Sequence, residues 1–162
     1  MSAPVARDTV HATALVVGEA GVLLRGVSGA GKSALALAVI AAARSRGRFA
    51  RLVGDDRVRL ARIGGALVAR PHPALAGQVE RRFVGVSAAR HEQGAVVRLL
   101  VDLVARDPAR NLPPRAPDAA EATALLLGVR VARMAVPIGD LAAAPLIFSM
   151  IETLRRSEGA VK

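Results

Sequence analysis

The residues best suited to chemistry stand together in a glycine-rich stretch at residues 26–33. Their order, Gly-Val-Ser-Gly-Ala-Gly-Lys-Ser, fits the phosphate-binding pattern G-x-x-x-x-G-K-[ST]. Glycines let the backbone curl so that its N–H groups point at phosphate oxygens, and a helix that follows adds the partial positive charge of its amino end. In this pattern Lys32 would reach the β- and γ-phosphates of a nucleotide, and the Ser33 hydroxyl would hold Mg²⁺. The candidate nucleotide-binding residues are Gly26, Val27, Ser28, Gly29, Ala30, Gly31, Lys32 and Ser33.

The lysine of this stretch runs against the composition of the chain. Of the 23 basic residues, only Lys32 and Lys162 are lysines, and the others are arginines. A compact ammonium group fits inside a curled phosphate loop, whereas a broad planar guanidinium does not. The choice of lysine therefore favours a phosphate site over a chance glycine-rich turn.

Phosphoryl transfer also needs a metal ion on the phosphates and a carboxylate that positions or deprotonates the acceptor. Two candidates are associated with apolar runs: the pair Asp55 and Asp56, and Asp102. Adjacent carboxylates are not buried cheaply unless a metal, basic groups or a shared proton compensates them. We therefore predict that Asp55 and Asp56 form the working site. Asp102 is either a further metal-binding element or a strand-edge carboxylate.

Strands and helices alternate around these groups. The loop follows a predicted strand at residues 22–25 and opens a run of strong helix formers at 33–43, with a helix end near Gly47. The other predicted elements are strands at 12–17, 49–53, 58–63, 66–69, 95–103 and 129–136, and an amphipathic helix at 141–156. We expect irregular structure at 71–90, a proline-rich surface loop at 106–118, and a short helix or turn at 119–127. The pattern predicts a single α/β domain at residues 11–158, preceded by a flexible lead-in at 1–10.

Composition narrows the function classes. The formal net charge of +10 favours anionic ligands or an acidic protein face, but the basic residues are scattered through the chain. Three Phe and no Tyr or Trp leave few stacking platforms, so nucleic-acid binding is not favoured. No apolar run approaches the roughly 20 residues that span a bilayer. The absence of cysteine excludes disulfides and thiolate chemistry, and a cytoplasmic location without a membrane partner is the default expectation.

Four features, taken together, point to a known family. His11 stands fifteen residues before Gly26, and the loop reads G-V-S-G-A-G-K-S. Residues 52–58 read L-V-G-D-D-R-V, and residues 80–86 read E-R-R-F-V-G-V. These features resemble the catalytic domain of HPr kinase/phosphorylase, whose patterns are G-x-S-G-x-G-K-S, L-[IV]-A-D-D-x-V and E-[IV]-R-G-[LI]-G-[IL]. That enzyme phosphorylates a serine of HPr, a phosphocarrier of the phosphotransferase system, and removes the phosphate by phosphorolysis.

The resemblance implies a role for each matching residue. Lys32 would stabilise charge on the transferred phosphate, and Ser33 and Glu80 would ligate Mg²⁺. The pair Asp55 and Asp56 would include the general base for the serine hydroxyl, which would act as the acid in phosphorolysis. Asp56 is favoured as the base, with Asp55 supporting metal-bound water. The remaining catalytic candidates are His11, Arg82 and Arg110, with Arg115 as a rival to Arg110.

The resemblance also implies a fold and partners. The fold would be a P-loop kinase core of the HPr kinase/phosphoenolpyruvate carboxykinase type, a mixed sheet with flanking helices and no separate N-terminal domain. The chain would be a cytoplasmic serine/threonine-protein kinase that uses ATP and Mg²⁺, acts on an HPr-type carrier and assembles as a hexamer; pyrophosphate is the other possible phosphate donor. Phe83 stands where the family has glycine, and its late basic stretch V-P-V-x-x-G-R-N is reduced to Val-Pro-Ile-Gly-Asp at 136–140. These departures leave open a nucleotide-binding regulatory module with reduced or lost catalysis. A small-molecule kinase built on the same loop is a third alternative, although the sequence offers no separate lid segment of adequate length.

Overall fold

The computed structural model describes residues 7–81, 85–88, 90–106 and 122–160. In these ranges the strands are β1 (Arg7–Val17), β2 (Ala20–Arg25), β3 (Ala50–Gly54), β4 (Arg57–Ile63), β5 (Ala66–Pro71), β6 (Gln78–Arg81), β7 (Gly85–Ala88), β8 (Ala95–Val104), β9 (Thr123–Leu126) and β10 (Val129–Pro137). The helices are α1 (Lys32–Ser45), the 3₁₀ turn η1 (Leu141–Ala143) and α2 (Ala144–Gly159). No helix in the described ranges has the length and apolar content needed to cross a bilayer.

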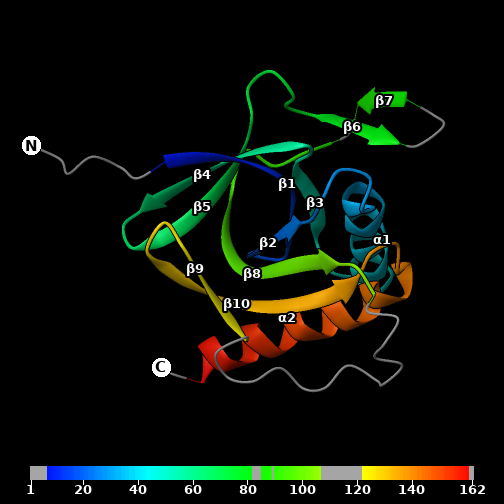
Figure 1. Ribbon diagram of the computed structural model, residues 1–162. Coiled ribbons are helices and arrows are strands. Elements are labelled where there is room, and N and C mark those ends of the chain that lie inside the picture. Colours follow the sequence, from blue (N-terminus) through cyan, green and yellow to red (C-terminus); the bar gives the residue numbers. More distant parts are fainter. Residues whose placement is uncertain (1–6, 82–84, 89, 107–121, 161–162) are drawn as a thin grey trace, which may run out of the picture.

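Most of the strands join one mixed sheet that curls back on itself (Figure 1). Its path runs β2-β1-β4-β5-β8-β10-β9, and β2 also pairs with β8, so five of these strands close a ring. The long strands β1 and β8 make this possible because each changes partner along its length. β1 pairs with β4 over residues 7–11 and with β2 over residues 12–17. β2, β8 and β10 are parallel, so their carboxyl ends meet at one edge.

Alternating side chains of this curled sheet feed two apolar cores. One face, including Leu15, Leu24 and Val101, packs against α1 and α2. The opposite face, including Leu23, Leu60 and Leu100, fills the inside of the ring. Because successive side chains of a strand point to opposite faces, β2 and β8 contribute to both cores with a period of two residues. The two cores together fix the parallel edge from which the glycine loop rises.

Several sequence predictions need correction. Residues 7–10, predicted as flexible lead-in, are paired with β4, although polar residues there gave no strand pattern. The stretch 71–90, predicted to be irregular, contains the hairpin β6–β7. Part of 119–127, predicted as helix or turn, is strand β9, which is stabilised by its ladder to β10. The proline-rich loop at 106–118 lies outside the described residues apart from Arg106.

Candidate active site

The glycine loop connects β2 to α1 at the parallel edge of the sheet. Gly31 caps α1 with a φ of 90°, a left-handed backbone conformation that residues other than glycine rarely adopt. At position 26 it is close packing that favours glycine, because a Cβ there would lie 3.1 Å from the Leu103 Cβ atom. The first turn of α1 carries no acidic residue, so its positive end is not neutralised by its own side chains. The loop therefore has the strand, curl and helix start that the phosphate pattern requires.

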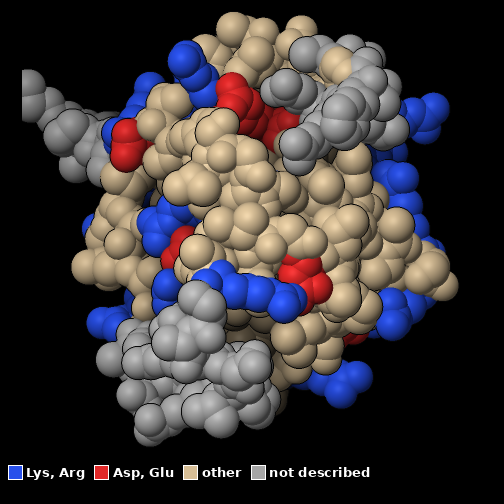
Figure 2. Space-filling model, turned by 45° about the vertical axis from the view of Figure 1, so that its right-hand side comes forward, with Lys and Arg blue, Asp and Glu red and all other residues tan. Residues whose placement is uncertain are grey.

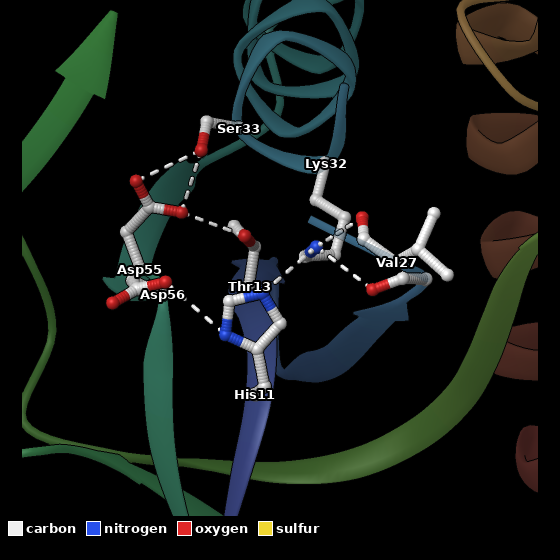
Figure 3. A network of polar contacts seen from close by, with 8 residues as sticks. His11, Thr13, Val27, Lys32, Ser33, Asp55 and Asp56 are labelled. Carbon is white, nitrogen blue, oxygen red and sulfur yellow. Dashed lines mark hydrogen bonds and ion pairs between the residues drawn. The ribbon is translucent and has the colours of Figure 1, made fainter. Parts of the chain in front are cut away.

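The ammonium group of Lys32 points to the first two residues of this loop (Figure 3). Nζ donates to the carbonyl oxygens of Gly26 at 2.9 Å and Val27 at 3.0 Å, and lies 3.4 Å from Nε2 of His11. Burial lowers the pKa of Lys32 below its ordinary value, and the charges of Asp55 and Asp56 act in the opposite direction. The positive charge of Lys32 is therefore held between the first carbonyl groups of the loop and His11.

Asp55, at the end of β3, is the buried acid of the site. Its carboxylate accepts hydrogen bonds from Ser33 Oγ at 2.8 and 2.9 Å and from Thr13 Oγ1 at 2.6 Å. Only 4% of Asp55 is exposed, and Thr13 is fully buried. Burial of a carboxylate requires such donors, because otherwise its desolvation is not compensated. The oxygens of Ser33 and Asp55 are the hard ligands that Mg²⁺ prefers, so this pair fits a magnesium site.

Asp56 is the exposed acid, and it faces away from Asp55 toward His11 (Figure 3). Its Oδ1 lies 3.1 Å from His11 Nδ1, and 55% of its side chain is exposed. Its backbone has a φ of 64°, and its carbonyl oxygen accepts from Ala12 N at 3.2 Å. Aspartate tolerates this left-handed conformation better than most residues, and strained backbone of this kind gathers at functional sites. The two adjacent carboxylates therefore have different environments and can take different roles.

The contacts of His11 fix its tautomer. An ammonium group can only donate, so the contact with Lys32 requires Nε2 to be the acceptor. The ring proton then lies on Nδ1, where it points at the Asp56 carboxylate. His11 thus bridges the cation under the loop and the exposed acid.

The structure assigns Asp102 to a charge cluster at the same edge of the sheet. Arg25 Nε lies 2.8 Å from its Oδ1, and Arg133 Nε lies 2.7 Å from its Oδ2. Burial alone would raise the pKa of Asp102, but hydrogen bonds and charges from Arg25 and Arg133 outweigh it and hold that pKa below its ordinary value. This pairing favours a structural role over the metal-binding alternative, because both carboxylate oxygens already face guanidinium groups.

The predicted site residues thus fall into two sets. His11, Lys32, Ser33, Asp55 and Asp56 come together at the loop. The side chain of Glu80 and the residues Arg82, Arg110 and Arg115 lie outside what the structure describes. Sequence reasoning missed Thr13, whose one signal was a polar residue inside the apolar run at 12–17. No cluster of three or more metal-ligating His, Cys, Asp or Glu side chains occurs among the described residues.

Comparison with known proteins identifies the family. The family model for the HPr serine kinase C-terminal domain matches residues 4–158. The chain belongs to this family. HPr kinase/phosphorylases from Neisseria meningitidis (strain FAM18) and Neisseria gonorrhoeae (strain NCCP11945) are each 39% identical to it over 110 residues, which cover 63% of this chain and 32% of the relative. The chain therefore matches about a third of the length of these curated relatives.

A solved structure supports the same assignment. The HPr(Ser) kinase/phosphatase from Coxiella burnetii superposes with a TM-score of 0.72 and 27% identity, covering 94% of this chain and 99% of that one. The predicted family and the predicted mixed sheet with flanking helices are both confirmed.

Proposed function

We propose that this chain is a Mg²⁺-dependent serine kinase that uses ATP to phosphorylate an HPr-type phosphocarrier protein. The observation that carries the proposal is the junction at the glycine loop, where Lys32, Ser33 and Asp55 meet the His11–Asp56 pair. A phosphate cradle alone would serve many proteins that bind nucleotides. The exposed carboxylate of Asp56 beside the loop adds a base that can accept the proton of an acceptor hydroxyl.

Each residue has a role in this proposal. The backbone of the loop and Lys32 bind the phosphates of ATP and offset the charge on the phosphoryl group. The oxygens of Ser33 and Asp55 hold Mg²⁺, which supplies charge neutralisation on the phosphates when bound. Asp56 accepts the proton of the acceptor serine. At the same time the serine oxygen forms the new bond to phosphorus, and the bond from phosphorus to the leaving oxygen of ATP breaks. His11 orients the Asp56 carboxylate through its Nδ1 proton.

The exposure of Asp56 suits a protein acceptor. Its side chain is 55% exposed beside a half-exposed His11, so a serine on the surface of a folded carrier can approach it. Microscopic reversibility makes the same carboxylate the acid of a phosphorolytic back reaction. We extend the proposal to Glu80 as a Mg²⁺ ligand, to Arg82 and Arg110 as groups that neutralise charge, and to a cytoplasmic homo-oligomer.

The test is transfer of radiolabelled phosphate from ATP to an HPr-type carrier in the presence of Mg²⁺. We expect transfer by the wild-type chain, strong loss in Asp56→Asn with nucleotide binding retained, and loss of both in Lys32→Met. Pyrophosphate replaces ATP in a parallel reaction to compare the two donors. Nucleotide binding without any transfer would refute the kinase assignment and favour the regulatory module instead.

A further inference from the structure

The amino-terminal half of β1, together with β4 and β5, forms a three-stranded part of the sheet beside the site (Figure 1). One face of these strands, which includes Val58, Leu60 and Ala69, is buried in the core inside the ring. Because successive side chains of a strand point to opposite faces, the residues between them point outward. Among the outward residues, His11 is half exposed and lies next to Asp56. This outward face is therefore a surface that a partner at the site can reach.

The outward face is strongly basic. Its four arginines, which we call the basic strip, are Arg7 on β1, Arg57 and Arg59 on β4, and Arg70 on β5. All four are exposed, and none of their guanidinium groups has an ion pair or a hydrogen bond in the described part of the chain. The one acid on these strand segments is Asp8, which alternation places on the opposite face, and its carboxylate accepts a hydrogen bond from Thr9 N. Figure 2 shows basic side chains along the edge where the grey amino-terminal residues lead into β1.

The ladder between β4 and β5 places two of these arginines directly opposite each other. Arg59 pairs with Arg70, and like charges in such positions destabilise a sheet. The stem of Arg70 also lies close to the backbone of Gly94, because a Cβ on that glycine would lie 3.3 Å from the Arg70 Cγ atom. No acid on the strip offsets the two charges, whereas an anionic partner would do so. The arrangement therefore indicates a binding surface rather than a stabilising pair.

The strip begins at the acceptor side of the site. Arg57 directly follows Asp56 in the sequence and pairs with His11, whose Nδ1 lies 3.1 Å from the Asp56 carboxylate. Strands rise about 3.3 Å per residue and lie about 4.8 Å apart, so the strip extends to about 15 Å from Asp56. A protein docked on the strip therefore also covers Asp56, the group proposed as the base.

We propose that the basic strip docks an acidic face of the acceptor protein, an inference that rests on the proposed function. Guanidinium groups bind carboxylates through paired hydrogen bonds, and exposed charges of opposite sign steer two proteins into register. A second copy of the chain is a poor occupant, because its net charge of +10 would add repulsion. The strand segments also contain no Phe, Tyr or Trp on which nucleic-acid bases could stack. The acceptor should therefore carry carboxylates within about 15 Å of its target serine.

The test measures phosphate transfer from ATP over a range of concentrations of an HPr-type carrier. The strip variant carries Arg59→Gln and Arg70→Gln. The control variant carries Arg62→Gln and Arg130→Gln, which remove the same charge from exposed positions on the opposite face of β4 and on β10. The strip variant should show a KM for the carrier about tenfold higher, with kcat and the KM for ATP unchanged. The control variant should behave as the wild type does.

Two further readouts separate docking from a structural role. Added salt should raise the carrier KM of the wild type and have little effect on the strip variant, because exposed charges are screened. The strip variant should also be at least as stable as the wild type in thermal unfolding, because the opposed charges are gone. A lower melting temperature would show that Arg59 and Arg70 support the fold, and it would count against the inference.

Three kinetic or binding results would overturn the inference. An unchanged carrier KM in the strip variant would mean that the acceptor docks elsewhere, and an equal rise in the control variant would mean that net charge alone attracts it. Strip-dependent binding of a labelled RNA oligonucleotide, with the carrier KM unchanged, would instead reveal a nucleic-acid surface. Failure of the proposed function looks different, because the wild type itself would then transfer no phosphate to the carrier. Direct binding of the carrier, measured by calorimetry, would still test the strip in that case.

Discussion

Replacing Thr13 with valine tests whether the buried acid of the site depends on its hydroxyl partners. The Thr13 hydroxyl donates to Asp55 at 2.6 Å in a place that is fully buried. Valine has nearly the same shape, so the change removes a donor without opening a cavity. No water reaches a fully buried position easily, and the carboxylate therefore loses a charge-assisted hydrogen bond without replacement.

The expected magnitude follows from that bond. Hydrogen bonds to charged groups contribute about 1.5–3 kcal/mol, so we expect Thr13→Val to lower the free energy of unfolding by about 2 kcal/mol. For a chain of this size, that corresponds to a fall of about 4–8 °C in melting temperature. If the whole of this free energy were added to the activation barrier of phosphoryl transfer, the rate of phosphate transfer would fall about thirtyfold, since each 1.36 kcal/mol is a factor of ten.

Two measurements and one control complete this test. Denaturant unfolding gives the stability, and transfer of phosphate from ATP to the carrier gives the rate. Thr13→Ser keeps the hydroxyl and loses one methyl group, so it should keep most of the rate while losing some stability. If Thr13→Val transferred phosphate at the wild-type rate, the hydrogen bond would not position Asp55 for catalysis, and Thr13 would be a packing residue alone.

Three further predictions concern the backbone and the charges around the loop. Asp56→Asn keeps a residue that tolerates the φ of 64° and should lower transfer at least a hundredfold with little change in stability, whereas Asp56→Ala should lose about 1 kcal/mol as well, as measured by thermal unfolding. Gly31→Ala should destabilise the chain by about 1–2 kcal/mol and weaken nucleotide binding, because its φ of 90° does not suit alanine, although the new Cβ would only make ordinary contact with Gly139 Cα at 3.9 Å; Gly159→Ala, without a positive φ, is the control and should not destabilise. Asp102 keeps its pKa below the ordinary 3.8 despite burial, so its charge stabilises the fold at neutral pH and that contribution is lost as the pH falls through the folded pKa. Asp102→Asn should therefore be less stable by about 1–3 kcal/mol at pH 7, and denaturant curves should show this difference shrinking toward pH 3; a constant difference would contradict the charge argument.

Local motifs predicted which residues lie together at the glycine loop. Lys32 and Ser33 belong to a motif whose glycines determine the backbone of the loop, and Asp55 and Asp56 directly follow the apolar strand β3. Their meeting point could be expected because a strand, a glycine loop and a helix leave few ways to arrange the carboxyl edge of a sheet. The resemblance to the HPr kinase family added the spacing of His11, which the structure places 3.4 Å from Lys32 Nζ.

Features that depend on distant pairing could not be predicted in this way. The partners of Asp102 lie 77 and 31 residues away in the sequence, at Arg25 and Arg133. Residues 7–10 and strand β9 lack a strong apolar alternation. They are strands because they form backbone hydrogen-bond ladders with β4 and β10, respectively. The left-handed backbone of Asp56 is likewise set by its surroundings, which include the bond from Ala12 N.

The change of partner along β1 constrains how sequences of this fold can vary. His11 is the last residue paired with β4, and Ala12 is the first paired with β2, so the acid-bridging histidine stands at the junction of two ladders. Inserting a single residue between His11 and Thr13 would reverse the facing of one of them and detach either the imidazole or the buried hydroxyl from its acid. The two-residue turn at Gly64 and Gly65, by contrast, can lengthen without disturbing either ladder. Evolutionary insertions should therefore accumulate at such turns and be absent from the short segment that joins the two halves of the first strand.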